Sequence, residues 1–326
     1  MQCVTFQEGR RSGDLHDFEQ VGKTVAENEH VIWLDLVDPS DDDFARLRKT
    51  FDLHPLAIED AQTAHERPKI EQYPEYLFLV VHAVTWDDDR LTTHELAVFA
   101  GHRFLITIRR TPVYSIEETE RRWAVHDGQL GSDAGFLLYT LLDTIVDAFF
   151  PIGDRLEEWI AELQTSLFDR QGDQRKLNEM LREIFELKND VHHARRAVVP
   201  MCDILQPLVR GDLRFFDRDE DRYYRDVYDH AIRVIDQLDS ARDLVGSALE
   251  IHLSLVANRQ NEVSKQLAII ATIFLPLSYV TGFFGQNFGA MVNSITSPQM
   301  FWFAGIGSEV VCVVVLLIYF RAKKWF

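Results

Sequence analysis

The spacing of hydrophobic and polar residues changes along the 326-residue chain, and the changes divide it into parts. Up to residue 126, short apolar runs rich in β-branched and aromatic residues alternate with polar segments, a pattern typical of strands with helices between them. Strands are expected at Val31–Val37, Tyr76–Val84, Leu96–Ala100 and Arg103–Ile108. Between the first two, Asp41–Asp60 has helical character, and Ser40 or Asp41 is suited to cap its start. Residues 1–126 are therefore predicted to form a cytosolic α/β domain.

Residues 127–222 have the period of amphipathic helices. From Phe136 onward, apolar side chains recur every three or four residues, which predicts one buried helical face. Pro151 is expected to bend this helix or to interrupt its hydrogen bonds. A second helix is predicted from about Asp173 to the neighbourhood of Val199, and the acidic stretch Gly211–Asp221 is predicted to be a loop. This part is expected to be a cytosolic helical region.

A third helical segment begins near Tyr223 and meets no proline before Pro276, so it is predicted to run unbroken to Phe284. At about 1.5 Å per residue, this helix measures roughly 90 Å. Its first part, residues 223–265, is expected to be a stalk. Seven stalk residues alternate steps of four and three: Val227, Ala231, Val234, Leu238, Ala241, Val245 and Ala248. This is the period of a helix packed along a partner, which is either the two preceding helices of the same chain or a second copy.

Residues 266–308 contain no Asp, Glu, Lys, Arg or His, whereas the rest of the chain is charged at ordinary density. This block begins with an apolar run at 266–285 and a polar loop at 286–299. A second apolar run at 300–320 and a basic tail at 321–326 follow. The uncharged stretch Leu267–Phe284 is about 27 Å long as a helix, close to the thickness of the hydrocarbon core of a bilayer. We predict two transmembrane helices, and the alternative is a buried hairpin of a soluble protein.

Charge limits both the partners and the topology. The chain has 34 basic and 52 acidic residues, a net charge of −18, and such a protein repels nucleic acid and attracts cations. Arg259 and Lys265 precede the first span, Arg321, Lys323 and Lys324 follow the second, and the loop between the spans carries no charge. The positive-inside rule then predicts a multi-pass protein of the cell membrane with both termini in the cytoplasm. The three cysteines are scattered, so no disulfide framework is predicted.

A four-and-three period that starts at Glu250, two residues after Ala248, gives a stripe of mostly small or polar side chains that runs into the first span. Its members are Glu250, Ser254, Ala257, Asn261, Ser264, Ala268, Ala271, Leu275, Ser278 and Gly282. Small residues let transmembrane helices pack closely, and stripes of this kind also line water-filled channels. Glu250 and Asn261 favour the channel, because polar groups near a bilayer need water or a partner. One hairpin cannot enclose a pore, so the channel interpretation predicts a symmetric homo-oligomer with the second span outside.

Glu309 lies about midway along the second span, where an acidic residue costs roughly 2.5–3.5 kcal/mol on insertion scales. Three explanations remain open at this point. The residue is protonated, it bonds to the neighbouring helix, or the second span starts later than residue 300.

The first span ends at Gly285-Gln286-Asn287, where glycine permits a turn out of the helix and asparagine offers a carbonyl acceptor. In its context this tripeptide resembles the CorA magnesium channel family, in which the corresponding span ends in a Gly-Met-Asn signature. The flanking segments that carry the resemblance are Asn261–Val263, Ile269–Leu277 and Thr281–Phe288. It extends over nearly the whole chain, through His54–Asp60, Arg67–Lys69, Tyr223–Asp226, Tyr228–His230 and Lys323–Phe326.

The resemblance implies a CorA-like homopentamer, in which a cytosolic α/β domain and a long stalk helix lead into a pore-lining span. It implies that a ring of Asn287 carboxamides, within the selectivity loop Gly285, Gln286 and Asn287, contacts the water shell of a hydrated Mg²⁺. Asp60 and Asp226 match a pair of aspartates that bind regulatory Mg²⁺ between subunits.

Further pore positions follow from the same resemblance and from the stripe. Glu250 is implied as an acidic ring at the cytosolic mouth, and Asn261 as a polar ring. Leu267 and Leu275 lie at or near hydrophobic constrictions, which gate by dewetting. The remaining pore-lining positions are Ser264, Ala268, Ala271 and Ser278.

These observations predict a channel for divalent cations, with Mg²⁺ as both the transported and the regulatory ion. Gln286 departs from the Gly-Met-Asn signature, so a Zn²⁺, Co²⁺ or Ni²⁺ transporter of the same family is the first alternative. A membrane-anchored oligomeric sensor that conducts nothing is the second. An enzyme is not expected, because the sequence has no Gly-rich phosphate loop, no Gly-x-Ser-x-Gly and no His-Glu-x-x-His motif.

Overall fold

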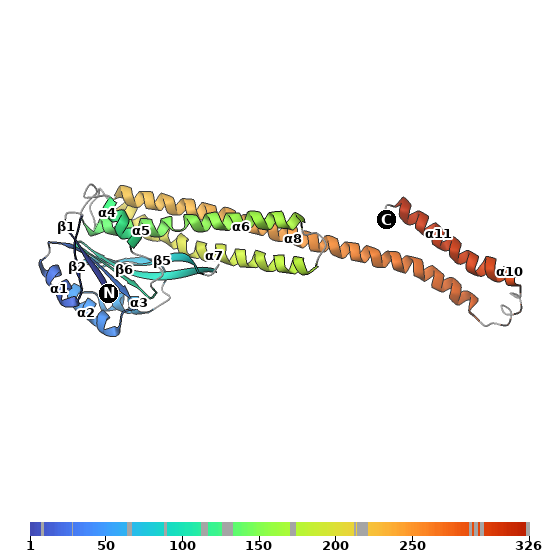
Figure 1. Cartoon of the computed structure of the whole chain (residues 1–326), viewed down its shortest axis with the longest axis horizontal. Helices are drawn as coiled ribbons and strands as arrows, with labels where there is room; N and C mark the ends of the chain where they lie inside the picture. The colour runs from blue at the N-terminus through green and yellow to red at the C-terminus, as the bar shows by residue number, and fades with distance from the viewer. Residues whose placement is uncertain are drawn as a thin grey trace. The chain divides into compact units, whose positions relative to one another are not determined.

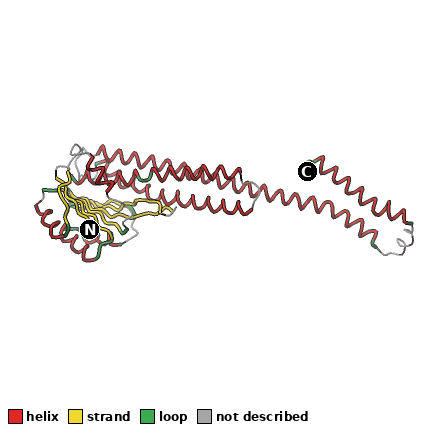
Figure 2. The backbone as a smooth tube through the Cα atoms, viewed as in Figure 1, coloured by secondary structure: helices red, strands yellow, loops and turns green. Residues whose placement is uncertain are grey.

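The structure is a computed structural model. It describes the chain except for residues 8–9, 28, 64–66, 88–89, 112–116, 126–132, 170–173, 212, 214–220, 287–288, 290–292, 294–296 and 324–326. The described residues form two compact units, Met1–Glu250 and Ile251–Phe326. All described strands belong to the first unit (Figure 2).

The first unit contains a seven-stranded sheet in the order β2-β1-β3-β7-β6-β5-β4. The strands are β1 (Gln2–Gln7), β2 (Arg10–Leu15), β3 (Val31–Val37), β4 (Lys69–Gln72), β5 (Tyr76–Asp87), β6 (Arg90–Gly101) and β7 (Phe104–Arg109). The pair β3–β7 is parallel and the other neighbours are antiparallel. The four predicted strands are confirmed as β3, β5, β6 and β7, and the α/β class is confirmed with them.

The sheet holds a buried ion pair beside its apolar core. Asp35 on β3 is 1% exposed, and the Arg109 guanidinium on β7 bonds both of its carboxylate oxygens, with Nη2 2.8 Å from Oδ2. The Thr107 hydroxyl donates to the same carboxylate at 2.7 Å. A buried carboxylate is tolerated when its oxygens are bonded in this way, so these contacts fasten the parallel pair β3–β7.

The segment Asp41–Asp60 forms two helices, α2 (Asp41–Phe51) and α3 (Pro55–Gln62). Ser40 is the N-cap of α2, and its backbone and side chain form a capping box with Asp43. Asp52 ends the helix in the left-handed region, with φ of 50°. Together with α1 (Phe18–Glu27), these helices lie on one side of the sheet, and α5 (Ala134–Asp147) and α7 (Gln174–Arg210) lie on the other (Figure 1).

The helical region contains α4 (Glu117–Val125), α5 (Ala134–Asp147), α6 (Phe150–Asp169) and α7 (Gln174–Arg210). The predicted interruption near Pro151 is confirmed, since α5 ends at Asp147 and α6 begins at Phe150. The predicted end near Val199 is wrong, because α7 continues through Pro200 and Pro207. Its buried side chains on both sides of Pro200, Val198 and Met201, keep the helix packed where a proline removes one hydrogen bond.

The long helix α8 spans Asp221–Phe284 without a break, as predicted. The seven stalk residues of the four-and-three period are all buried, at 0–2% exposure. The helices of the same chain cover this face. Tyr224 donates to Gly135 O of α5 at 2.8 Å, Gln237 to Asp154 of α6 at 3.0 Å, and Arg195 of α7 to Asp239 at 2.7 Å. The helices that pack against the buried face of the stalk are therefore those of the same chain.

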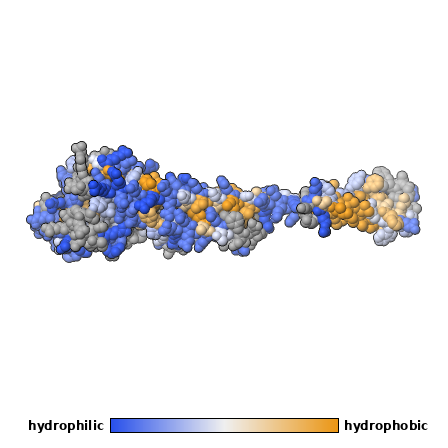
Figure 3. All heavy atoms as spheres, turned by 90° about the horizontal axis from the view of Figure 1, so that it is seen from above, coloured by the Kyte–Doolittle hydropathy of each residue, from blue (hydrophilic) through white to orange (hydrophobic). Residues whose placement is uncertain are grey.

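The second unit contains the end of α8, then α10 (Pro298–Met300), the π-helix η2 (Phe301–Ile306) and α11 (Gly307–Ala322). In the described residues, three helical segments are long and apolar enough to cross a membrane: Ala134–Ser166, Asp221–Phe284 and Pro298–Ala322. The apolar window of the first is mostly buried inside the protein, so it belongs to the core. The windows of the other two are not buried, and Figure 3 shows apolar surface gathered there.

Candidate cation pathway and acidic cluster

The small and polar stripe of α8 is exposed along its length. In the first unit, Glu250 is exposed two residues after the buried Ala248. In the second unit, exposure continues at Ser254, Ala257, Asn261, Ser264, Ala268, Ala271, Leu275, Ser278 and Gly282. The large apolar side chains of the same helix, among them Leu267 at 62% and Phe274 at 63%, are exposed as well. Within one chain, the surface of this membrane-length helix is thus available both to lipid and to further copies.

The predicted selectivity loop begins where α8 ends. The Gly285 amide donates to Thr281 O at 2.9 Å, and the Gln286 amide donates to Phe283 O at 3.3 Å. A Cβ atom at Gly285 would lie 3.1 Å from Thr281 O, so only glycine fits this close turn without a shift of the helix end. Gly285 and Gln286 are exposed. Asn287, the third member of the predicted loop, lies outside the described residues.

Glu309 bonds to the neighbouring helix, which is one of the three explanations left open by the sequence. Its Oε1 atom lies 2.8 Å from the Thr281 hydroxyl, on the last turn of α8. Glu309 is in the first turn of α11.

Asp60, a predicted regulatory residue, lies on α3 and has a lysine partner. Lys69 Nζ is 2.6 Å from Asp60 Oδ2 and 3.0 Å from Glu71 Oε1. Burial favours the neutral amine, but the hydrogen bonds that Lys69 donates to Asp60 and Glu71 outweigh this effect and raise the pKa of Lys69. The Asp60 carboxylate therefore shares a cation of its own chain, Lys69, with Glu71.

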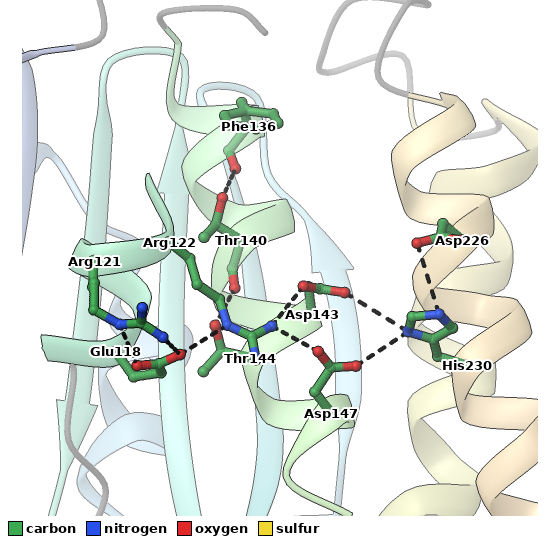
Figure 4. A network of polar contacts seen from close by, with 10 residues as sticks. All are labelled: Glu118, Arg121, Arg122, Phe136, Thr140, Asp143, Thr144, Asp147, Asp226 and His230. Carbon is green, nitrogen blue, oxygen red and sulfur yellow. Dashed lines mark hydrogen bonds and ion pairs between the residues drawn. The ribbon is translucent and has the colours of Figure 1, made fainter. Parts of the chain in front are cut away.

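Asp226, the second predicted regulatory residue, lies on α8 at the edge of an acidic cluster that motif reasoning missed. The cluster consists of Asp143 and Asp147 on α5 and His230 on α8, and ligand atoms of these three lie within 4.8 Å of one another. His230 Nδ1 is 3.1 Å from Asp147 Oδ1 and 3.9 Å from Asp143 Oδ1. Its Nε2 atom is 3.9 Å from Asp226 Oδ2 (Figure 4).

Arg122 on α4 closes the cluster from the other side. Its Nη1 atom is 2.9 Å from Asp143 Oδ2 and 2.7 Å from Asp147 Oδ2, and its Nε atom is 3.1 Å from Glu118 Oε1 (Figure 4). Burial opposes its charge, but the hydrogen bonds that Arg122 donates to Asp147 and Glu118 raise the pKa of Arg122. Glu118 bonds both Arg121 and Arg122, and these bonds lower its pKa to about 2.

Burial and the repulsion between carboxylates shift pKa values within the cluster itself. Burial first, and then the charge of Asp147, raise the pKa of Asp143, whereas Arg122 and His230 oppose this shift. Tyr139 stands nearby, and burial together with the charges of Asp143 and Asp226 raises the pKa of its hydroxyl. A site with this excess of negative charge favours the approach of a cation.

The donor set fits a hard divalent cation. Carboxylate oxygens are the ligands that Mg²⁺ prefers, and a histidine nitrogen broadens the choice toward Zn²⁺, Co²⁺ and Ni²⁺. Asp226 is the most accessible of these side chains, at 59% exposure. Asp60 and Asp226 have different partners within the chain, since one pairs with Lys69 and the other with His230.

The sequence contained a signal for part of this cluster. Asp226 and His230 are four residues apart on the predicted stalk and therefore on one helical face. Asp143 and Asp147 have the same spacing on the helix that is predicted from Phe136 onward. Neither pair shows which face of one helix meets the other, because 83 residues separate Asp147 from His230.

The fold and these sites define a class of protein: a large α/β and helical unit whose longest helix continues into one of two membrane-length helices joined by a short polar loop. The sequence profile described as CorA-like Mg²⁺ transporter protein matches residues 28–324. The chain belongs to this family. It is a family of membrane transport proteins rather than of enzymes.

Two bacterial relatives match over most of their length. A Bacillus subtilis protein, YfjQ, is 31% identical over 298 residues, which cover 90% of this chain and 89% of YfjQ. The cobalt/magnesium transport protein CorA of Thermotoga maritima is 30% identical over 287 residues, which cover 86% of this chain and 79% of that protein.

A solved structure shows the same fold. The complete structure of the CorA magnesium transporter from Methanocaldococcus jannaschii superposes with a TM-score of 0.82 at 22% identity, covering 100% of this chain and 99% of that chain. This likeness confirms the predicted order of α/β domain, long helix and C-terminal helical pair.

Proposed function

We propose that this chain is one subunit of a homopentameric channel that carries divalent cations, with Mg²⁺ as the preferred ion, into the cell. The observation that carries the proposal is the continuity of α8. One unbroken helix of 64 residues bears Asp226 and His230 near its start, and the membrane-length stripe and the loop lie at its end. Membership of the CorA-like Mg²⁺ transporter family supports the choice of ion.

The outer loop is the proposed site of first cation contact. Gly285 lets the chain leave α8 in a close turn, and Gln286 and Asn287 follow with carboxamide side chains. Carboxamide oxygens suit an ion that dehydrates reluctantly, because they accept hydrogen bonds from its water shell.

The proposed conduction path follows the stripe of α8. Glu250 raises the local cation concentration at the cytosolic mouth. Asn261, Ser264 and Ser278 offer polar atoms to a hydrated ion. Leu267 and Leu275 form the constrictions of the pore. The small side chains of Ala268 and Ala271 make the pore wider between these two constrictions.

Several copies are needed because one helix supplies only one wall of a pore. From the family resemblance we infer that there are five copies, with α11 outside the ring. The basic residues beside both spans, and the charge-free loop between them, support a topology with both termini in the cytoplasm.

The regulatory part of the proposal concerns cytosolic Mg²⁺. Asp60 and Asp226 are proposed to bind it between subunits, and Asp143, Asp147 and His230 supply further ligand atoms beside Asp226. A bound cation would neutralise like charges that otherwise repel, and would favour the closed state over the open one.

Transport in liposomes tests the function. The full chain is reconstituted, and uptake is measured for Mg²⁺, Zn²⁺, Co²⁺ and Ni²⁺ in parallel. Mg²⁺ flux that is lost in the Asn287→Ala variant supports the proposal. Flux of Zn²⁺, Co²⁺ or Ni²⁺ without Mg²⁺ flux would show that the chain is a transporter of those ions, the alternative suggested by Gln286. The absence of flux for every cation would instead favour the membrane-anchored sensor that conducts nothing.

A further inference from the structure

Glu309 is the only charged residue between Lys265 and Arg321. An isolated acidic side chain at membrane depth needs a partner, because an unpaired one costs several kcal/mol. The structure provides one partner within the same unit. The Thr281 hydroxyl lies 2.8 Å from Glu309 Oε1 and joins α8 to α11.

The backbone before Glu309 has a widened turn. Residues Phe301–Ile306 form the π-helix η2, whose end is marked by the Gly307 amide donating to Trp302 O. The Ser308 hydroxyl lies 2.6 Å from Ala304 O and 2.8 Å from Gly305 O, so it satisfies carbonyls at this turn. A π-turn rotates the residues that follow it relative to a continuous α-helix, and such turns occur frequently at functional sites.

Thr281 is bonded both to the second span and to the loop. Its backbone carbonyl accepts the Gly285 amide at 2.9 Å, and its hydroxyl lies 2.8 Å from Leu277 O as well as from Glu309. The residue that Glu309 holds is therefore the one that anchors the first residue of the loop. A path of two hydrogen bonds connects Glu309 to Gly285.

We propose that Glu309 is a positioning residue for the outer loop. Its hydrogen bond to Thr281 fixes the last turn of α8, and thereby holds Gly285 and Gln286 in the geometry that receives a cation. The inference rests on the proposed function of this loop and adds a residue from the second span to its machinery.

The Thr281 hydroxyl has a single proton, which decides how the contact works. An ionised Glu309 accepts this proton. A protonated Glu309 instead donates to Thr281 Oγ1, and Thr281 then donates to Leu277 O. The interhelical bond forms in both states, so it depends on hydrogen bonding rather than on charge.

Conservative and disruptive substitutions separate the role of the hydrogen bond from the role of the Glu309 charge. Glu309→Gln keeps a hydrogen-bonding group without charge, and Thr281→Ser keeps the hydroxyl. Glu309→Leu and Thr281→Val remove the bond from either side. We expect Mg²⁺ flux in liposomes to fall about three- to tenfold in the two disruptive variants, the factor expected for one interhelical hydrogen bond in a membrane.

The two conservative variants should retain most of the flux. The double variant Thr281→Val/Glu309→Leu should lose no more flux than the worse single variant, because both remove the same bond. Val311→Leu, at an exposed position of α11, is the matched control and should behave as the wild type. Loss of flux in Glu309→Gln equal to that in Glu309→Leu would overturn the proposal, since it would assign a role to the charge.

Hydrogen–deuterium exchange tests the same bond without transport. In the wild-type protein the Gly285 amide is bonded to Thr281 O, so the peptide that contains residues 282–286 should exchange faster in Glu309→Leu and Thr281→Val than in Glu309→Gln. Equal exchange in all four proteins would overturn the positioning role. If the wild type transports no cation, the proposed function fails, whereas the exchange result still decides whether Glu309 holds the loop.

Discussion

His230 Nδ1 lies 3.1 Å from Asp147 Oδ1, and this contact joins α8 to α5 inside an acidic cluster. The imidazole ring is also within 3.9 Å of Asp226 and of Asp143. The histidine thus stands between a partly buried pair of carboxylates and an exposed one. A cation that binds at Asp226 changes the charge seen by both helices.

Removal of Arg122 should make the acidic cluster more dependent on Mg²⁺. In the Arg122→Gln variant, Asp143 and Asp147 lose their guanidinium partner, and we expect a loss of about 2 kcal/mol in stability without added cations. Added Mg²⁺ should then raise Tm more than it does in the wild type, because a ligand stabilises the folded state that binds it. Thermal unfolding of the full-length protein across a Mg²⁺ series measures both effects.

Arg121→Gln is the control for this experiment. Arg121 bonds Glu118 but neither aspartate of the cluster. Its replacement should change neither Tm nor the Mg²⁺ response by a comparable amount. An equal Mg²⁺ response in Arg122→Gln and the wild type would show that the guanidinium does not compete with a bound cation.

Replacement of Asp60 and Asp226 by alanine should make transport less sensitive to internal Mg²⁺. These two acids are the proposed regulatory ligands, and without them a rise in internal Mg²⁺ should no longer favour the closed state. We expect the internal concentration that halves flux to rise about tenfold or more in the double variant. Liposomes loaded with increasing Mg²⁺ give this value, and unchanged inhibition would count against the site.

Substitution of Gly285 by alanine should lower flux without preventing assembly. The added Cβ atom would stand 3.1 Å from Thr281 O, so the helix end or the loop must shift by a few tenths of an ångström. A displacement of this size at a first contact site should reduce the rate several-fold. Gly289→Ala is the matched control, because no atom of the described residues lies within 4 Å of a Cβ atom there. Flux in Gly285→Ala as fast as in Gly289→Ala would contradict the close-turn argument.

Acid should destabilise the protein partly through His94. Burial lowers the pKa of this side chain in the folded protein below its ordinary value of 6.5, and the neighbouring Asp87 opposes the shift. The unfolded chain therefore takes up a proton that the folded protein does not. The contribution of His94 to the free energy of unfolding is complete above about pH 6.5 and is lost as the pH falls toward the folded-state pKa.

A glutamine at position 94 cannot titrate but can still bond Thr85, which His94 contacts at 2.8 Å. Between pH 7.5 and 5.5, we expect Tm of the wild type to fall about 2 °C further than that of His94→Gln. The exposed His16→Gln variant should follow the wild type. A Tm difference that does not change with pH would refute the assignment.

The helices were predictable because their signals are local and repeated. The absence of proline between Tyr223 and Pro276 predicted α8, and the four-and-three period identified its buried face. That period did not identify the partner, since a stripe of Val and Ala fits a neighbouring helix of either the same or another chain. The structure settled this through contacts such as Tyr224 to Gly135, which are distant in sequence.

Elements with weak or polar patterns were not predictable. The edge strand β4 has only four residues, with the sequence Lys-Ile-Glu-Gln, and is held by its pairing with β5 rather than by its own pattern. The same limit applies to Arg122. A basic residue on a polar helix is ordinarily exposed, and only tertiary structure brings it to Asp143 and Asp147.

Between Val227 and Ala248, the buried face of α8 consists of three valines, three alanines and the single large residue Leu238. Short side chains make shallow ridges, so the neighbouring helices interlock with α8 less deeply than with a leucine-rich face. The polar contacts of His230, Gln237 and Asp239 then become the main features that distinguish one axial position of α8 from the next. The register of this helix is set by charge and hydrogen bonding more than by shape.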